Sequence, residues 1–97
     1  MKTIIFNKDT SWKYDSSDQD HNRYFLKDGL RSLERSFEVY GYLYLSKVYE
    51  RLGIEWNPND ENVVFKKDDG PIRLEFDHNE VTNEYMVTIA QQHKKDV

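Results

Sequence analysis

The sequence predicts one small α+β domain over residues 1–97, with two packed helices against a three-stranded antiparallel β-meander. Two patterns predict this fold class. Apolar residues recur every three or four positions in the first half of the chain, a period typical of amphipathic helices. After Gly53 they alternate with polar residues, which is typical of strands with one buried face. A chain of 97 residues has room for one hydrophobic core.

The chain begins with a short apolar run, residues 2–6, that is rich in β-branched side chains and would suit a small strand. Residues 7–20 are then polar and indicate a loop. We therefore expect residues 1–19 to form a loop-like arm. Trp12 and Tyr14 are the side chains expected to anchor it.

The strongest periodic signal predicts a helix from about residue 20 to residue 40. Its apolar stripe consists of residues spaced four and three apart, namely Leu26, Leu30, Leu33, Phe37 and Tyr40. A side-chain cap at the start is expected from Ser17, Asp18 or Asp20. Gly41 follows where a helix commonly ends in a left-handed residue.

A shorter second helix is expected over residues 46–52, with Gly53 as its stop signal. Two turns are unstable alone in water, so this helix should pack against the first. Four of the seven tyrosines lie in or beside it: Tyr40, Tyr42, Tyr44 and Tyr49. Tyrosines in such a cluster form the rim of a core or a binding surface.

Three strands are expected after a turn at residues 57–60: near 62–67, over 72–77 and over 85–89. Residues 68–71 are interpreted as a hairpin connection, residues 78–83 as a second loop, and residues 91–97 as a frayed tail. The predicted core combines both helices and the last two strands: Leu26, Leu30, Leu33, Phe37, Leu45, Val48, Leu52, Ile72, Leu74, Phe76, Val87 and Ile89.

The net charge of −4 is unevenly distributed. Residues 21–53 are mildly basic, whereas residues 54–84 carry nine carboxylates against three cations. One row of cations spaced four apart follows the first helix: Arg23, Lys27, Arg31 and Arg35. This basic row is either a solvated face with exposed ion pairs or a phosphate-binding ridge, and the interleaved glutamates favour the solvated face.

A strip of small residues marks another flank of the same helix. Gly29 lies in the helix interior, where glycine costs about 1 kcal/mol relative to alanine. Phe25, Ser32 and Ser36 share its flank, so another backbone can approach closely there. We expect a two-fold homodimer through this flank, with cover by residues 2–6 or by Trp12 as the alternative.

No catalytic, cofactor or metal site is predicted. Cysteine is absent, which removes thiolate nucleophiles and cysteine-containing zinc sites. The histidines His21, His78 and His93 lie in separate segments. Glu75 and Asp77 share one face of a strand and are interpreted as solvated charges rather than a magnesium site. The chain has no apolar run of the roughly 20 residues that a membrane helix needs, so we expect a cytoplasmic protein without a membrane partner.

The middle of the chain contains Phe37, near the end of the first predicted helix, and then the run Gly41-Tyr42-Leu43-Tyr44-Leu45-Ser46-Lys47-Val48-Tyr49-Glu50-Arg51-Leu52-Gly53-Ile54. This pattern resembles small uncharacterised proteins of Gram-positive phages and integrative elements. Tyr44 departs from that pattern, because a small capping residue is expected there. The resemblance implies an accessory protein of a mobile element and transfers no catalytic residue.

The predicted function is that of a non-enzymatic module that binds another protein. The acidic half would engage a basic partner surface, including that of a nucleic-acid-binding protein. The alternative is a winged-helix-like nucleic-acid-binding protein that uses the basic row. Residues 54–62 are too short for a recognition helix and carry acidic residues, which makes nucleic acid the less favoured partner.

Overall fold

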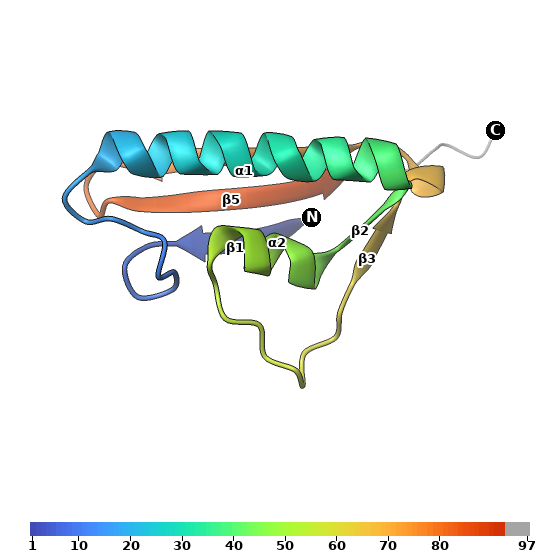
Figure 1. The fold of residues 1–97 in the computed structure, drawn as a ribbon, viewed down its shortest axis with the longest axis horizontal. Coiled ribbons are helices and arrows are strands. Elements are labelled where there is room, and N and C mark those ends of the chain that lie inside the picture. The colour runs from blue at the N-terminus through green and yellow to red at the C-terminus, as the bar shows by residue number, and fades with distance from the viewer. Residues whose placement is uncertain (93–97) are drawn as a thin grey trace.

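The computed structural model describes residues 1–92, which fold into two α-helices and five strands (Figure 1). In chain order the elements are β1 (Lys2–Phe6), α1 (Gln19–Tyr40), β2 (Tyr42–Tyr44), α2 (Leu45–Leu52), β3 (Val64–Lys66), the short 3₁₀ helix η1 (Lys67–Asp69), β4 (Ile72–Asn79) and β5 (Glu84–Gln91). The predicted α+β class is thus confirmed. No helix in this part of the chain is long and apolar enough to cross a membrane.

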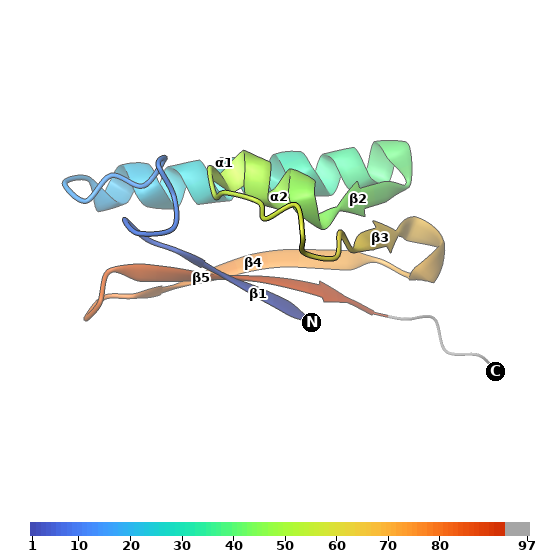
Figure 2. The ribbon, with the colours of Figure 1, turned by 90° about the horizontal axis from the view of Figure 1, so that it is seen from below.

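The strands form two antiparallel sheets rather than one meander. The larger sheet has the order β1-β5-β4, and the smaller one pairs β2 with β3. Figure 2 shows both helices on one side of the larger sheet. An antiparallel sheet tolerates such an arrangement because its polar face can stay in water.

The predicted strand near residues 62–67 exists in part as β3, but it does not pair with β4. Its partner is β2, with Leu43 opposite Phe65. The predicted hairpin at residues 68–71 is therefore wrong: η1 and Gly70 carry the chain from one sheet to the other. Local alternation predicts a strand without specifying its partner, which explains the error.

The third strand of the larger sheet is β1, which confirms the small strand expected over residues 2–6 and limits the loop-like arm to the residues that follow it. β1 lies beside β5, with Ile4 opposite Val87 and Phe6 opposite Tyr85. The side chains of Ile4 and Phe6 point to the helices and are buried. β5 thereby becomes the central strand, paired on both sides.

Both helix ends follow the predicted signals. The Asp18 side chain accepts a hydrogen bond from the His21 amide at the start of α1, and Gly41 ends α1 in the left-handed conformation. Gly53 ends α2 in the same way. The stripe of α1 ends one turn earlier than predicted, however, because Tyr40 is 68% exposed.

The start of α2 is stabilised by hydrogen bonds to residues that are distant in the sequence. Tyr44 precedes the helix and makes no side-chain cap. Instead, the Leu45 amide donates to the Val63 carbonyl at 2.8 Å, and the Ser46 amide donates to Asn62 Oδ1 at 3.1 Å. These bonds satisfy helix N–H groups that have no partner within the helix itself.

The core lies between the helices and the larger sheet. Ten of the predicted core residues are buried, whereas Ile72 and Phe76 are only half-buried. Five buried residues were not predicted: Ile4, Phe6, Leu43, Ile54 and Tyr85. Fully burying a large apolar side chain contributes about 1.5–3 kcal/mol, so the unpredicted residues are a substantial part of the core.

The two predicted anchors of the N-terminal segment behave differently. Tyr14 is half-buried: its hydroxyl donates to the Asn83 carbonyl at 2.8 Å, and its ring meets Phe6 edge-on at 5.6 Å. Trp12 is 69% exposed, so its side chain is not an anchor. Ser11 fixes this stretch instead, since it is buried and its hydroxyl donates to the Leu52 carbonyl. At the other end, the predicted tail begins too early because Gln91 belongs to β5; residues 93–97 lie outside the described residues.

Candidate functional site

A groove with a volume of about 610 Å³ lies between α1, β2 and α2. We call it the tyrosine groove. Its floor is formed by Leu33 and Leu43, and its walls contain hydroxyl, aromatic and charged groups. The other lining residues are Lys13, Ser32, Ser36, Tyr40, Tyr42, Tyr44, Lys47, Glu50 and Arg51.

The fold positions the tyrosines through β2. Gly41 reverses the chain after α1, and strand alternation then buries Leu43 while it exposes Tyr42 and Tyr44 on the other face. Tyr42 and Tyr44 are 49% and 42% exposed, and their rings meet edge-on at 5.6 Å. Pairing with β3 holds this strand in place. The result is a preformed aromatic wall open to solvent.

The charged groups of the groove are partly paired. Lys47 Nζ lies 3.3 Å from Glu50 Oε2, within α2. Arg51 Nη2 lies 3.0 Å from Asp28 Oδ2 and so ties α2 to α1. Three cations and one carboxylate line the groove, so its own charge is positive. Such a groove attracts an acidic ligand.

The predicted flank of α1 is divided between two surroundings. Gly29 is buried, and a Cβ added there would lie 3.5 Å from Cγ of Arg51. Phe25 is half-buried, stacks on Phe6 at 5.7 Å and has the Arg51 guanidinium 5.7 Å from its ring centre. This end of the flank is thus covered within the same chain, by Arg51 of α2 and by Phe6 from residues 2–6, whereas Trp12 is exposed. Ser32 and Ser36 remain accessible in the tyrosine groove.

The basic row stays together on the exposed side of α1. Arg23 pairs with Asp20. Lys27, Arg31 and Arg35 form no ion pair with any residue of the described part of the chain. Within residues 1–92 no third α-helix follows Gly53, so the recognition helix of a winged helix has no counterpart here.

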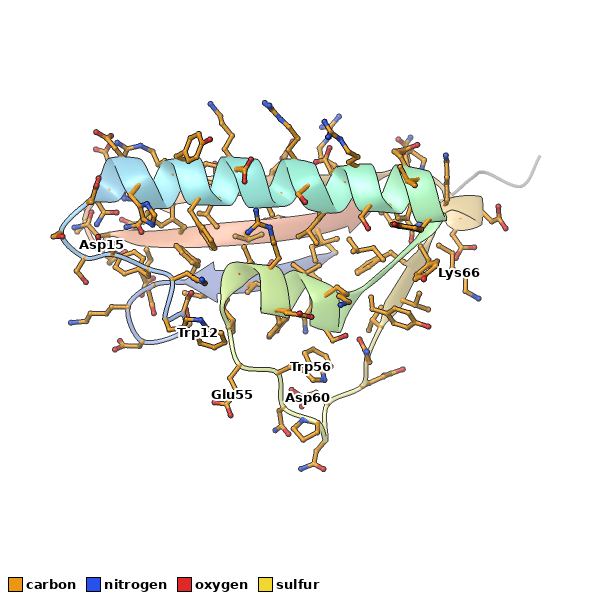
Figure 3. All side chains as sticks on the ribbon, in the orientation of Figure 1. Trp12, Asp15, Glu55, Trp56, Asp60 and Lys66 are labelled. Carbon is orange, nitrogen blue, oxygen red and sulfur yellow. The ribbon has the colours of Figure 1, made fainter. Side chains whose placement is uncertain are left out.

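The carboxylates of residues 54–84 do not form one acidic surface. Glu55 and Asp60 lie on the loop that extends beyond α2 (Figure 3), whereas Glu75 and Asp77 lie on β4. Residues 1–92 contain no group of three or more His, Cys, Asp or Glu side chains placed to hold a metal ion. A basic partner surface would therefore meet only separate parts of the acidic half.

A buried polar network at the start of α1 was not predicted. Asn22 is fully buried; its Oδ1 accepts from the Asp15 amide at 2.8 Å, and its Nδ2 donates to the Asp15 carbonyl at 2.7 Å and to Gln19 Oε1 at 3.1 Å. The Tyr85 hydroxyl donates to the same Gln19 oxygen at 2.7 Å. The network links the N-terminal loop, α1 and β5.

Two pKa values at this end of the molecule are shifted. The hydroxyl and the amide of Ser17 donate to the Asp15 carboxylate and lower its pKa. Burial raises the pKa of the Tyr85 phenol. Both shifts thus follow from local contacts, a hydrogen-bonded turn at Asp15 and burial at Tyr85.

Comparison of the chain with protein-family models, with curated proteins and with solved structures gave no match. Sequence reasoning missed the groove as a site, although the tyrosine cluster was a usable signal for it. Lys13 carried no signal, because only the tertiary structure brings the N-terminal loop to α2.

Proposed function

We propose that this chain is a non-enzymatic, cytoplasmic protein-binding module, and that the tyrosine groove holds an acidic segment of its partner. The observation that carries the proposal is the wall of exposed tyrosines, Tyr40, Tyr42 and Tyr44, above an apolar floor. Tyrosine and arginine are enriched at the centres of protein interfaces because they offer large contact area and a polar group together. The resemblance of residues 37–54 implies an accessory role in a mobile element, which is part of the proposal.

The charge of the groove defines the partner. Lys47 is paired with Glu50 and Arg51 with Asp28, whereas Lys13 has no ion-pair partner within residues 1–92. The unpaired Lys13 ammonium therefore favours an acidic side chain at the rim. The floor of Leu33 and Leu43 favours an aliphatic or aromatic side chain that can leave water. The expected ligand is a short segment that combines carboxylates with one or two large apolar residues.

A displayed library of random peptides tests this specificity. Selection on the wild-type chain should enrich peptides that carry Asp or Glu beside Leu, Phe or Trp. Their affinity should fall about tenfold or more for the Tyr42→Ala/Tyr44→Ala variant, as for truncated interface residues of this kind. Ser36→Arg provides a second variant that fills the groove without removing a strand residue.

Tyr24→Ala is the matched control, because Tyr24 is 72% exposed on α1 but lies outside the groove. The control should bind the selected peptides like wild type. Peptides that bind all variants equally, or selection that yields basic peptides, would contradict the proposal.

A second copy of the chain is the competing occupant, since Ser32 and Ser36 of the predicted dimer flank line the same groove. Sedimentation equilibrium separates the two. A groove reserved for an acidic partner segment requires a monomer for wild type and for Ser32→Arg, in place of the homodimer expected from the sequence. A wild-type dimer that Ser32→Arg dissociates would assign the groove to self-association instead.

Nucleic-acid binding is a second candidate function, favoured by one observation: three cations of the basic row have no ion-pair partner within residues 1–92. Phosphate contacts would produce binding that weakens steeply with salt. A gel-shift titration at low salt, repeated with Arg31→Glu/Arg35→Glu, tests it. Saturable binding that this variant abolishes would favour the second candidate.

A further inference from the structure

A second surface lies along the free edge of the larger sheet. β4 is eight residues long and pairs only with β5 in the described part of the chain, whereas β1, the other edge strand, has five residues. The Leu74 amide points away from β5, because it donates to Glu34 Oε1 at 3.2 Å. The outer edge of β4 is thus within reach of an oxygen acceptor.

Backbone groups of alternate residues in an antiparallel edge strand point to the same side. Those of Ile72, Phe76 and His78 therefore point outward together with Leu74. Of the outward amides and carbonyls, only the Leu74 amide has a hydrogen-bond partner among residues 1–92. An open row of donors and acceptors of this kind is a template for another strand.

A groove of about 470 Å³ runs beside this edge, between α1 and β4. Lys27, Arg31 and Glu34 form its α1 side, and the Glu34 carboxylate is held by the Leu74 amide. Leu30, Leu74 and Phe76 add apolar surface, and Glu75 and Asp77 complete the lining. The odd-numbered residues of β4 point away from the helices. Arg73 is paired there with Glu75, whereas Asp77, which also borders the groove, has no ion-pair partner within residues 1–92. Neither Lys27 nor Arg31 is ion-paired within residues 1–92.

We infer that an extended polypeptide segment binds along β4 as an added strand, with acidic side chains toward α1 and basic side chains toward the opposite face. Side chains of a strand alternate between the two faces, so the ligand needs alternating charge. Main-chain hydrogen bonds would supply affinity, and the charges would set register and orientation. This site is separate from the tyrosine groove and does not rest on the proposed function.

A second copy of this chain does not fit the same edge. Among the strands of the larger sheet, α1 packs mainly on β4, and Figure 2 shows it on the same side of the sheet as α2. Paired strands lie about 4.8 Å apart, whereas packed helices need about 8–10 Å between their axes. Two copies joined through β4 would force their α1 helices too close together, but a single extended segment has no such helix.

The test uses a capped peptide of four Glu-Lys repeats and a control of the same composition with four Glu followed by four Lys. Titration into the ¹⁵N-labelled chain should shift the amide signals of Phe76 and His78 more than those of Glu75 and Asp77. It should also slow hydrogen exchange of the outward amides. The block-sequence peptide should bind several-fold more weakly, because it lacks the alternation.

Two sets of substitutions should act in opposite directions. Lys27→Glu/Arg31→Glu should weaken binding about fivefold, the value for two exposed ion pairs. Glu34→Ala should strengthen it about threefold, because it frees the Leu74 amide for the ligand. Arg35→Glu, on the same row but outside the groove lining, is the control and should change affinity by less than about twofold.

The inference is overturned if the alternating peptide fails to bind or binds no better than the block-sequence peptide. It is also overturned if inward and outward amides respond alike, or if Glu34→Ala weakens binding. Loss of binding in Tyr42→Ala/Tyr44→Ala would assign the peptide to the tyrosine groove instead. Because the two sites use different residues, failure of one proposal leaves the other intact.

Discussion

Replacement of Asn22 is expected to be among the most damaging single polar changes in this chain. Its side chain is fully buried and makes three hydrogen bonds, two of them with the backbone of Asp15. Gln19, the third partner, also accepts from the buried Tyr85 hydroxyl. Asn22→Ala therefore breaks the link between the N-terminal loop and α1 and weakens the link to β5.

The magnitude follows from the number of bonds and the exposure of their partners. A typical hydrogen bond contributes about 1 kcal/mol net, which gives about 3 kcal/mol for the three bonds. Asp15 is exposed, so water can replace part of the loss at its backbone groups. The expected decrease in the free energy of unfolding is therefore about 2 kcal/mol. A larger loss would require that the partners stay buried and unsatisfied.

Urea unfolding followed by circular dichroism measures this change. Asn59→Ala, in an exposed loop position, is the control and should lie within about 0.5 kcal/mol of wild type. Native-state hydrogen exchange should show faster exchange near Asp15 in the Asn22→Ala variant. A decrease below about 0.5 kcal/mol would show that the network does not hold the loop, and the reasoning from buried hydrogen bonds would fail.

Three further outcomes are expected. Burial raises the Tyr85 pKa above its ordinary value of 10.0, so the neutral phenol stabilises the folded state. That stability is present below pH 10.0 and is lost as the pH rises through the folded-state pKa. The urea midpoints at about pH 9 and about pH 11 should therefore differ less for Tyr85→Phe than for wild type. Gly53→Ala should destabilise the fold more than Gly41→Ala. Both glycines have positive φ, but a Cβ at Gly53 would lie 2.5 Å from the Lys13 side chain, whereas a Cβ at Gly41 would meet open space. Equal melting temperatures of the two variants would refute this. Gly29→Ala should stabilise by up to about 1 kcal/mol, since the helix gains propensity and the nearest atom, at 3.5 Å, is in ordinary contact; a loss in urea unfolding would instead reveal a need for glycine there.

The acidic half illustrates how charge in sequence differs from charge in space. Residues 54–84 are acidic as a segment, yet their carboxylates are divided among the loop after α2, η1, β4, the turn between β4 and β5, and the start of β5. The basic row behaves differently because one helix carries it, and residues four apart share a helix face. Only the cations therefore form a continuous surface that was predictable from spacing.

The sequence alone determined the elements whose signals are local. The stripe from Leu26 to Phe37 and the stop at Gly41 define α1, and Gly53 defines the end of α2. Alternation defines the inward faces of β4 and β5, and their short connection makes them a hairpin. Each of these features depends on residues a few positions apart, where period and backbone conformation are fixed by the chain itself.

The tertiary structure decided the pairings between distant segments. β1 pairs with β5 although their partner residues are 79 to 87 positions apart, and β3 pairs with β2 rather than with the neighbouring β4. Tyr40 and Trp12 are exposed although their residue type favours burial, because no helix or strand within residues 1–92 covers them. The tyrosine groove likewise needs the N-terminal loop, α1, β2 and α2 together. Strand pairing and the walls of the groove depend on the total apolar area that the whole fold buries, and a local sequence pattern does not specify that total.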